Sequence, residues 1–244
     1  EWFTMSNEER IELFRIGRDQ VRSVPVLAGI SAIATGDAVE LASAARDLGL
    51  DGALLLPPPY VLPTDRELER YVSAIAEVGL PIMLYNNPGR TGINLDLRWL
   101  KKLSRHPEIV AVKESTKDIH QLGATIRGIG DELAVFTGME TYVGALVERG
   151  GAGVVGMAPN VFGRLPADLY TALNLGDMQE VRRLQEAIDG LYARMYGGMH
   201  NPYVVLKEAM RALGRPGGFP RPPLLPFEGR ERDELASFLA GVQR

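Results

Sequence analysis

Six short apolar runs, separated by longer amphipathic stretches, are the feature that most constrains the fold of this 244-residue chain. Each run is apolar throughout rather than alternating, which is typical of parallel strands that are covered on both faces. Successive runs begin roughly 20–30 residues apart, the size of one strand followed by one helix. The runs lie at residues 24–28, 53–56, 81–85, 109–112, 133–136 and 153–155.

Helical patterns fill the intervals between these runs and continue alone after the last run. Apolar residues recur at helical spacing, for example at 37–48, 66–78, 95–105 and 119–129. From Leu165 to Arg244 only helical patterns remain, and the last helix is expected at 230–242. No repeat or linker divides the chain. We therefore predict a single domain, with a (β/α) barrel portion over 1–164 and a C-terminal helical extension over 165–244 packed on it.

Six strand–helix units fit two α/β architectures, an open parallel sheet and a TIM (β/α)8 barrel. The sequence begins at Glu1 without an initiator methionine, which favours a barrel whose first two strands are missing from this chain. About 50 further residues upstream would supply two strands and a helix and reach the usual barrel length. We predict the barrel, with a C-terminal helical extension.

Composition excludes several classes of function. Lys and Arg total 27 against 31 for Asp and Glu, so no basic surface attracts nucleic acid or an anionic membrane. The absence of cysteine excludes disulfides, thiolate metal sites and a cysteine nucleophile. The apolar runs are far shorter than the about 20 residues that cross a bilayer, and no secretory signal opens the sequence. We expect a cytoplasmic protein that acts on a small molecule, with no nucleic-acid or membrane partner.

Two polar residues end neighbouring apolar runs, at the edge where parallel barrels place their active sites. Lys113 follows Val112, and Tyr85 ends the run 81–85. Burial of a lysine favours its neutral amine, which attacks a ketone carbon to form an imine, and a nearby tyrosine can transfer the protons. The pattern alone is also compatible with a solvated lysine at a strand end and a core tyrosine with a wet hydroxyl.

The residues around this pair resemble two motifs of the dihydrodipicolinate synthase / N-acetylneuraminate lyase family. Residues 85–92 read Tyr-Asn-Asn-Pro-Gly-Arg-Thr-Gly, and residues 112–116 read Val-Lys-Glu-Ser-Thr. Lys113 and Tyr85 are 28 residues apart, as that family's fold places them on consecutive strands. The similarity extends along the whole chain. It implies a TIM barrel and a class I, imine-forming lyase or aldolase that acts on a 2-oxo acid without a cofactor or metal.

The resemblance implies three catalytic residues. Lys113 would form a Schiff base with the ketone carbon of pyruvate, and Tyr85 would relay protons during that reaction. Tyr60 would be a second tyrosine of the relay, contributed across a tight dimer interface. This role implies a homotetramer built as a dimer of dimers. Glu1 resembles the last residue of the family's Gly-Thr-Thr-Gly-Glu segment, so the threonine that completes the relay is not in this sequence.

The resemblance also implies how substrates are bound. Arg90 would bind the carboxylate of the second substrate, because a guanidinium matches a carboxylate bidentately, and Gly138 and Val155 would border the oxo acid and the lysine. Arg90 favours condensation of pyruvate with aspartate semialdehyde, the dihydrodipicolinate synthase reaction. Pro59, which stands where the family has a tyrosine, favours instead an aldolase or dehydratase acting on a 2-keto-3-deoxy sugar acid or a 4-hydroxy-2-oxo acid.

Two further classes of protein are considered. A metal-dependent aldolase needs clustered ligands, whereas His106, His120 and His200 lie on separate segments without ligand spacing, so we expect no metal. A non-catalytic member of the family that senses a 2-oxo acid would keep the same pocket. Pyruvate with borohydride distinguishes the last alternative, because an enzyme is trapped as an adduct on Lys113 and a sensor need not react.

Overall fold

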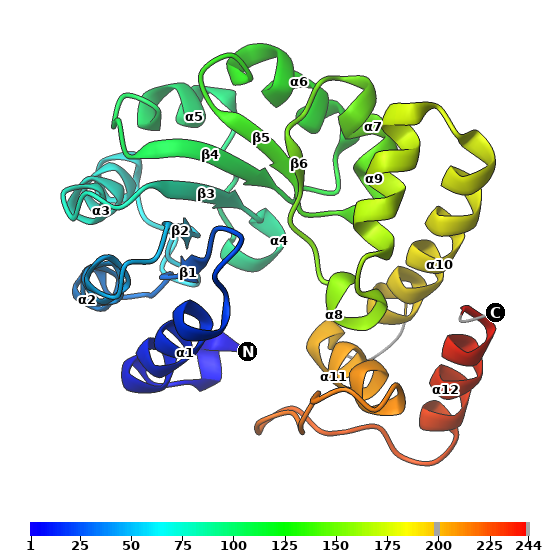
Figure 1. Cartoon of the computed structure of the whole chain (residues 1–244). Coiled ribbons are helices and arrows are strands. Elements are labelled where there is room, and N and C mark those ends of the chain that lie inside the picture. Colours follow the sequence, from blue (N-terminus) through cyan, green and yellow to red (C-terminus); the bar gives the residue numbers. More distant parts are fainter. Residues whose placement is uncertain (198–200, 243–244) are drawn as a thin grey trace.

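A computed structural model describes residues 1–197 and 201–242 of the chain. Six parallel strands form one curled sheet, in which they are ordered as they occur in the sequence (Figure 1). The six apolar runs therefore each contain or overlap a strand. The strands are β1 (Leu27–Gly29), β2 (Gly52–Leu55), β3 (Ile82–Asn86), β4 (Ile109–Glu114), β5 (Ala134–Thr137) and β6 (Gly153–Val154).

The first strand begins three residues later than its apolar run predicts. Pro25 has no N–H to donate to a ladder, and the N–H of Val26 donates to the carboxylate of Asp51 at 2.8 Å instead of to a neighbouring strand. Val24 is exposed and adds nothing to the core. Residues 24–26 are apolar but form a loop that leads into β1.

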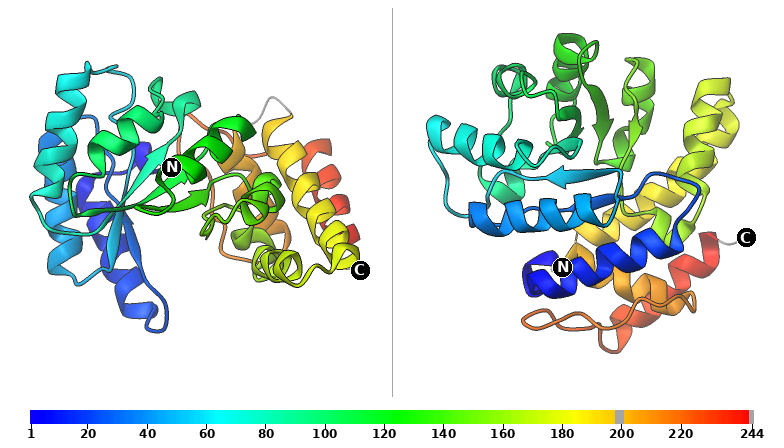
Figure 2. Two further views of the ribbon diagram at one scale, coloured as in Figure 1. Left: turned by 90° about the horizontal axis from the view of Figure 1, so that it is seen from above. Right: turned by 60° about the vertical axis from the view of Figure 1, so that its left-hand side comes forward.

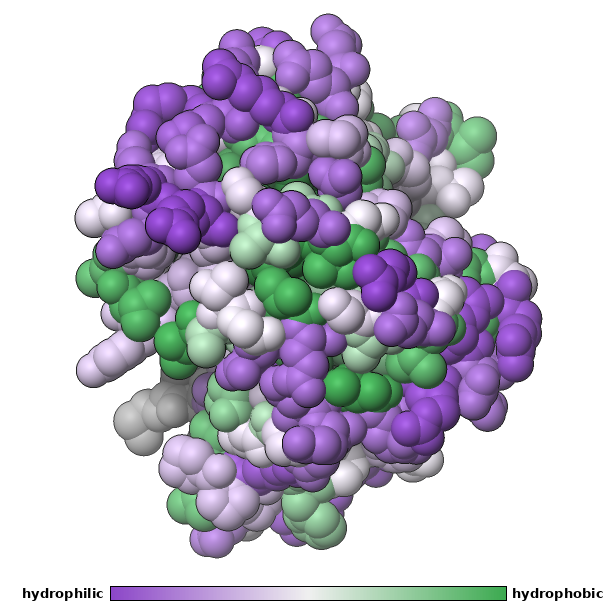
Figure 3. Space-filling view, turned by 90° about the vertical axis from the view of Figure 1, so that its left-hand side faces the viewer, coloured by the Kyte–Doolittle hydropathy of each residue, from purple (hydrophilic) through white to green (hydrophobic). Residues whose placement is uncertain are grey.

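Helices cover the outer side of the curl between successive strands (Figure 1). The face of the molecule shown in Figure 3 is largely hydrophilic, with hydrophobic side chains gathered between the hydrophilic ones. Within the described residues no helix combines the length and the hydropathy needed to cross a membrane. Up to Phe162 the helices are α1 (Asn7–Gln20), which precedes β1, then α2 (Thr35–Asp47), α3 (Asp65–Ala76), α4 (Pro88–Thr91), α5 (Leu97–Leu103), α6 (Ile119–Ile129), α7 (Val143–Glu148) and α8 (Pro159–Phe162), with 3₁₀ turns at Trp2–Thr4 and Glu140–Tyr142. The short helices α4 and α8 directly follow the C-terminal ends of β3 and β6.

After α8, four helices lie together on one side of the sheet (Figure 2). They are α9 (Leu165–Leu175), α10 (Met178–Tyr196), α11 (Pro202–Ala212) and α12 (Arg230–Val242). No strand follows β6 in the described part of the chain, which agrees with the sequence pattern. The division at residue 164 stays a prediction.

Two apolar cores hold these layers. The first joins the strands to the outer helices. The second joins α9–α12 to Val143, Ala158 and Val161, which belong to the segments after β5 and β6. The second core therefore fixes α10 and α11 relative to the ends of these two strands, and this arrangement positions one wall of the site.

Ion pairs link the start of the chain to α11 and to the segment between α11 and α12. The guanidinium of Arg221 makes two hydrogen bonds with the Glu9 carboxylate, each 2.8 Å long, and Lys207 forms a salt bridge with Glu1. In the described residues β1 pairs with β2 alone and β6 with β5 alone, so the curled sheet is open. Its closure by two further strands stays a prediction.

Candidate active site

The pairing of β3 with β4 brings Lys113 and Tyr85 side by side. The register places Tyr85 opposite Lys113 at the C-terminal ends of the two strands. Paired positions of parallel strands project to the same face, and the Nζ of Lys113 lies 4.1 Å from the centroid of the Tyr85 ring. Both side chains are half-buried. The spacing of 28 residues therefore corresponds to a direct contact between neighbouring strands.

The hydroxyl of Tyr85 contacts Asn87, whereas its ring contacts Lys113. It accepts a hydrogen bond from the side-chain amide of Asn87 at 3.0 Å. Asn87 directly precedes α4, whose first residue is Pro88. In the described part of the chain the Lys113 amine contacts the face of the ring, and no hydrogen bond joins it to the hydroxyl. The phenol keeps its own proton available for donation to a ligand.

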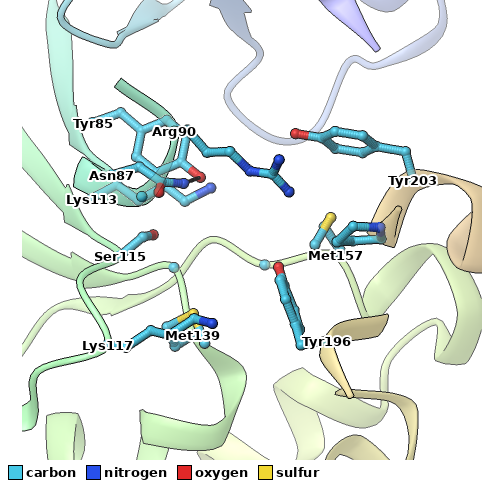
Figure 4. A pocket seen from close by; sticks show the side chains of 14 residues that line it. Tyr85, Asn87, Arg90, Lys113, Ser115, Lys117, Met139, Met157, Tyr196 and Tyr203 are labelled. Carbon is cyan, nitrogen blue, oxygen red and sulfur yellow. Dashed lines mark hydrogen bonds between the residues drawn. The ribbon is translucent and has the colours of Figure 1, made fainter. Parts of the chain in front are cut away.

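These residues open into one cavity of about 360 Å³ (Figure 4). Its volume is within the range of small-molecule sites. Four of the six residues predicted from the sequence line it, namely Lys113, Tyr85, Arg90 and Gly138. The remaining lining residues are Asn87, Gly89, Ser115, Lys117, Met139, Gly156, Met157, Tyr196, Pro202 and Tyr203.

Gly138 leaves space for the lysine. A Cβ atom at this position would lie 1.8 Å from Ser115 Oγ and 2.7 Å from Lys113 Cε, both closer than van der Waals contact allows. The Gly138 N–H donates to the carbonyl of Glu114 at 2.7 Å, which fixes the close approach. Ser115 Oγ is buried and has no hydrogen-bond partner among the described residues. An unpaired buried hydroxyl at the wall of a cavity is suited to bind a ligand.

Arg90 projects across the cavity from α4 toward α11 (Figure 4). Its guanidinium carbon lies 5.9 Å from the centroid of the Tyr203 ring, a cation–π contact. The helix that carries Arg90 ends at Thr91 and is capped by Gly92, whose φ of +76° is a left-handed conformation. The turn thus aims a guanidinium at the side of the cavity opposite the strands.

Two of the predicted residues do not line the cavity. The Val155 N–H donates to the Thr137 carbonyl at 2.9 Å and continues the pairing of β5 with β6, while Gly156 and Met157 form the wall instead. Tyr60 is 89% exposed, has a φ of +76°, and lines neither this cavity nor an adjoining one of about 410 Å³. Within one chain Tyr60 is therefore separate from Lys113.

A buried carboxylate, which no sequence motif indicates, lies behind the wall of the cavity. Glu140 is fully buried; its Oε1 accepts the Ala158 N–H at 2.8 Å, and its Oε2 accepts a hydrogen bond from the Tyr192 hydroxyl. A Cβ at Gly156 would collide with this carboxylate. Burial, followed by the charge of Glu140, raises the pKa of Tyr192. The sequence carries no signal for this contact, because its partners come from separate elements that are brought together by packing.

Two further phenols, which no sequence motif indicates, lie at the opposite wall of the cavity. Tyr196 is the last residue of α10, and Tyr203 follows the first residue of α11. Partial burial raises the pKa of Tyr196 to about 12, the Tyr85 phenol adds to the shift, and the positive charge of Arg90 opposes it. Burial also raises the pKa of Tyr203. Both hydroxyls are therefore protonated hydrogen-bond donors at neutral pH.

The described residues contain no group of three or more side chains suited to hold a metal ion. The His106 ring makes a hydrogen bond with Ser73 at 3.2 Å. His120 is exposed at the start of α6, and His200 lies outside the described residues. That no metal takes part stays a prediction.

The fold and the cavity define an α/β enzyme of the TIM-barrel type with a lysine at the end of one strand. The Dihydrodipicolinate synthetase family model matches residues 1–241. The chain therefore belongs to this family, as its motifs predict, and is a lyase or synthase of the class I, Schiff-base type.

Individual relatives agree with this assignment. The chain is 36% identical to an uncharacterized DapA-like lyase of Rhizobium meliloti, over 96% of this chain and 80% of that one. It is 35% identical to the 4-hydroxy-tetrahydrodipicolinate synthase of Citrifermentans bemidjiense, over 92% and 77%. Among solved structures, YagE of E. coli K12 in complex with pyruvate is similar with a TM-score of 0.91 at 25% identity, over 99% and 83%. The synthase of Cyanidioschyzon merolae with lysine bound has a TM-score of 0.89 at 31% identity, over 98% and 82%.

Proposed function

We propose that this chain acts on pyruvate through an imine on Lys113, most like 4-hydroxy-tetrahydrodipicolinate synthase, which condenses pyruvate with aspartate semialdehyde. The observation that carries the proposal is the position of Lys113. Lys113 lies near the C-terminal end of β4, and its side chain lines the cavity beside Tyr85. This side chain occupies space that any side chain at position 138 would fill. Relatives named as this synthase and a structural neighbour in complex with pyruvate support the same chemistry.

The proposed reaction begins with the addition of the Lys113 amine to the ketone carbon of pyruvate. The resulting carbinolamine loses water to give an imine, and a proton from the Tyr85 phenol converts the departing hydroxyl into that water. The imine withdraws electrons from the adjacent carbon, which loses a proton and becomes an enamine. The enamine carbon then attacks the aldehyde carbon, forming the new carbon–carbon bond, and hydrolysis of the product imine restores the amine.

Arg90 supports an acidic aldehyde as the second substrate, because a guanidinium in the cavity pairs with a carboxylate. A different observation favours a second candidate. Pro59 lines the adjoining cavity next to Tyr85 and Arg90, at the position where the family has a tyrosine. A paralogous aldolase or dehydratase that acts on a 2-keto-3-deoxy sugar acid or a 4-hydroxy-2-oxo acid would have a differently shaped entrance there. Gly138 would border the oxo acid, as would the backbone next to Val155.

We propose that the enzyme is cytoplasmic and forms a homotetramer, with Tyr60 completing the site of a neighbouring copy. Tyr60, Val61 and Leu62 are consecutive and each at least half exposed, which is an apolar surface suited to an interface. Light scattering after size exclusion tests the tetramer. A monomer that turns over pyruvate would contradict the role of Tyr60.

Trapping with borohydride tests the chemistry. Incubation with pyruvate and borohydride should add one reduced pyruvate to the intact mass, and peptide mapping should place it on Lys113. Lys113→Met should remain unmodified, whereas Lys101→Met, on the exposed side of α5, should be trapped like the parent. A panel of aldehydes assayed with pyruvate then separates the synthase from the sugar-acid aldolase. The absence of an adduct, with pyruvate still bound, would indicate a sensor.

A further inference from the structure

The charged side chains that line the cavity are all basic. Three cations, Lys113, Arg90 and Lys117, line it, and no Asp or Glu does so among the described residues. None of the three forms a salt bridge with a carboxylate in the described part of the chain. Lys113 is taken up by the imine in the proposed function, and Arg90 lies at the far wall. Lys117 is thus the lining cation to which the proposed chemistry gives no role.

The backbone at Lys117 is held in place. Its carbonyl accepts a hydrogen bond from the hydroxyl of Tyr142 at 3.2 Å. The adjacent Asp118 carboxylate accepts the N–H groups of His120 and Gln121 at 2.8 and 3.2 Å and so caps α6. These bonds hold the Asp118 carboxylate at the start of α6, and among the described residues it forms no salt bridge with Lys117.

Lys117 faces Tyr196 across the lower part of the cavity. Its Nζ lies 5.3 Å from the centroid of the Tyr196 ring. In Figure 4 the Tyr196 hydroxyl points up into the cavity, between Lys117 on one side and Arg90 on the other. An ammonium group and a phenol that donates a hydrogen bond are together suited to bind an oxygen anion.

We propose that Lys117 and Tyr196 form a subsite for an acidic group of the substrate, a carboxylate or a phosphate carried by the aldehyde partner. The inference rests on the proposed function, because it assigns the aldehyde that reacts with the enamine on Lys113. Coulomb attraction then selects an anionic aldehyde over a neutral one of similar size. Arg90 and Lys117 flank this group from opposite sides.

Substitution of Lys117 in the full-length chain tests the subsite. Four aldehydes are compared with pyruvate as donor, namely glyceraldehyde, glyoxylate, aspartate semialdehyde and glyceraldehyde 3-phosphate. Lys117→Met should raise KM about tenfold for the acidic aldehydes that bind there and leave KM for glyceraldehyde within about twofold. Lys117→Arg should retain most of the selectivity, and Lys101→Met should match the parent. A larger effect on the phosphate than on the carboxylates identifies a phosphate subsite, and the reverse identifies a carboxylate subsite.

Calorimetry tests the same subsite without turnover. 2-Oxoglutarate has two carboxylates and pyruvate has one, so Lys117→Met should weaken binding of 2-oxoglutarate about tenfold and leave binding of pyruvate unchanged. Added salt should weaken the binding of 2-oxoglutarate to the parent more than to Lys117→Met. Equal effects on neutral and acidic ligands, or no effect on either, would overturn the subsite. Failure of borohydride trapping would instead refute the proposed function. The calorimetric comparison of 2-oxoglutarate with pyruvate would still test the subsite, because it measures binding without turnover.

Discussion

The amine of Lys113 lies over the face of the Tyr85 ring, 4.1 Å from its centroid, while the hydroxyl of the same ring accepts a hydrogen bond from Asn87 at 3.0 Å. The two ends of one side chain thus have separate partners. The ring face attracts a cation, and an iminium on Lys113 would carry the same charge as the ammonium. The hydroxyl is oriented by the Asn87 amide, which donates to its oxygen and leaves its proton free for transfer.

Tyr85→Phe separates these two roles. It keeps the ring beneath the lysine and removes only the hydroxyl, so pyruvate should still be trapped on Lys113 by borohydride, but more slowly, because the departing water loses its proton donor. The loss of the proton donor should lower kcat by about 10²–10⁴-fold. Steady-state kinetics and intact mass measure the two effects. Tyr85→Leu, which removes the ring as well, should also reduce the yield of the adduct, and unchanged kcat in Tyr85→Phe would exclude the relay.

Gly138→Ala should displace the lysine. The added methyl group would lie 2.7 Å from Lys113 Cε and 1.8 Å from Ser115 Oγ, and misplacement of a reacting group by about 1 Å costs about 10²-fold in rate. We therefore expect kcat/KM to fall by about that factor. Gly138→Ala should also lower the melting temperature. Adding Ser115→Ala removes one of the two collisions, so the melting temperature should return toward that of the parent while the activity should not. Recovery of both would show that Ser115 alone was displaced.

Much of this site can be predicted because it follows from strand order. Continuous apolar runs identify the six strands, and Tyr85 and Lys113 end two neighbouring strands, so parallel pairing places them together. The start of β1 is harder to predict, because Val24 and Val26 are apolar while Pro25 and the Asp51 carboxylate divert the backbone from the ladder.

The opposite wall could not be predicted, because packing rather than pattern determines it. Tyr196 and Tyr203 reach the cavity only because the second core fixes the angles of α10 and α11. Val155 and Gly156 are adjacent residues, and the strand ladder uses the first while the cavity uses the second. A shift of one residue exchanges such roles. The proposed place of Tyr60 in the site of a neighbouring copy likewise depends on assembly, which a sequence pattern does not show.

The buried phenol of Tyr71 predicts a loss of stability at alkaline pH. Its hydroxyl donates to the Ala32 carbonyl at 3.0 Å, and burial raises the pKa of Tyr71 to about 12. In the unfolded chain the phenol ionises near pH 10. Between about pH 10 and 12 the unfolded state loses this proton and the folded state keeps it, so the free energy of unfolding falls as pH rises, by up to about 1.4 kcal/mol per pH unit for this group.

Urea unfolding at pH 8 and at pH 11 measures this effect. Tyr71→Phe should lower the free energy of unfolding by about 1 kcal/mol at pH 8, through loss of the hydrogen bond. The same variant should lose less stability than the parent between the two pH values, because it has one fewer phenol to ionise. A parallel decline of both proteins would contradict the assignment.

We predict that the contact between Glu140 and Tyr192 positions the cavity wall, because this buried carboxylate joins the wall to the second core. Glu140→Ala leaves the Ala158 N–H and the Tyr192 hydroxyl without their acceptor, and two buried unsatisfied donors should cost about 3 kcal/mol of stability. Tyr192→Phe removes one donor and should cost about half as much. Because Gly156 and Met157 lie next to this carboxylate and line the cavity, both variants should also raise KM for the oxo acid, while Lys113 should still be trapped.

The double variant shows whether the two side chains act together. Glu140→Gln keeps the shape of the side chain and an acceptor for Ala158, so it should be milder than Glu140→Ala. In a cycle with Tyr192→Phe, residues in direct contact should show a coupling energy above about 0.5 kcal/mol, whereas independent residues add within that limit. Additive free energies of unfolding would show that the two side chains act independently. An unchanged KM in Glu140→Ala would show that the carboxylate stabilises the fold without positioning the wall.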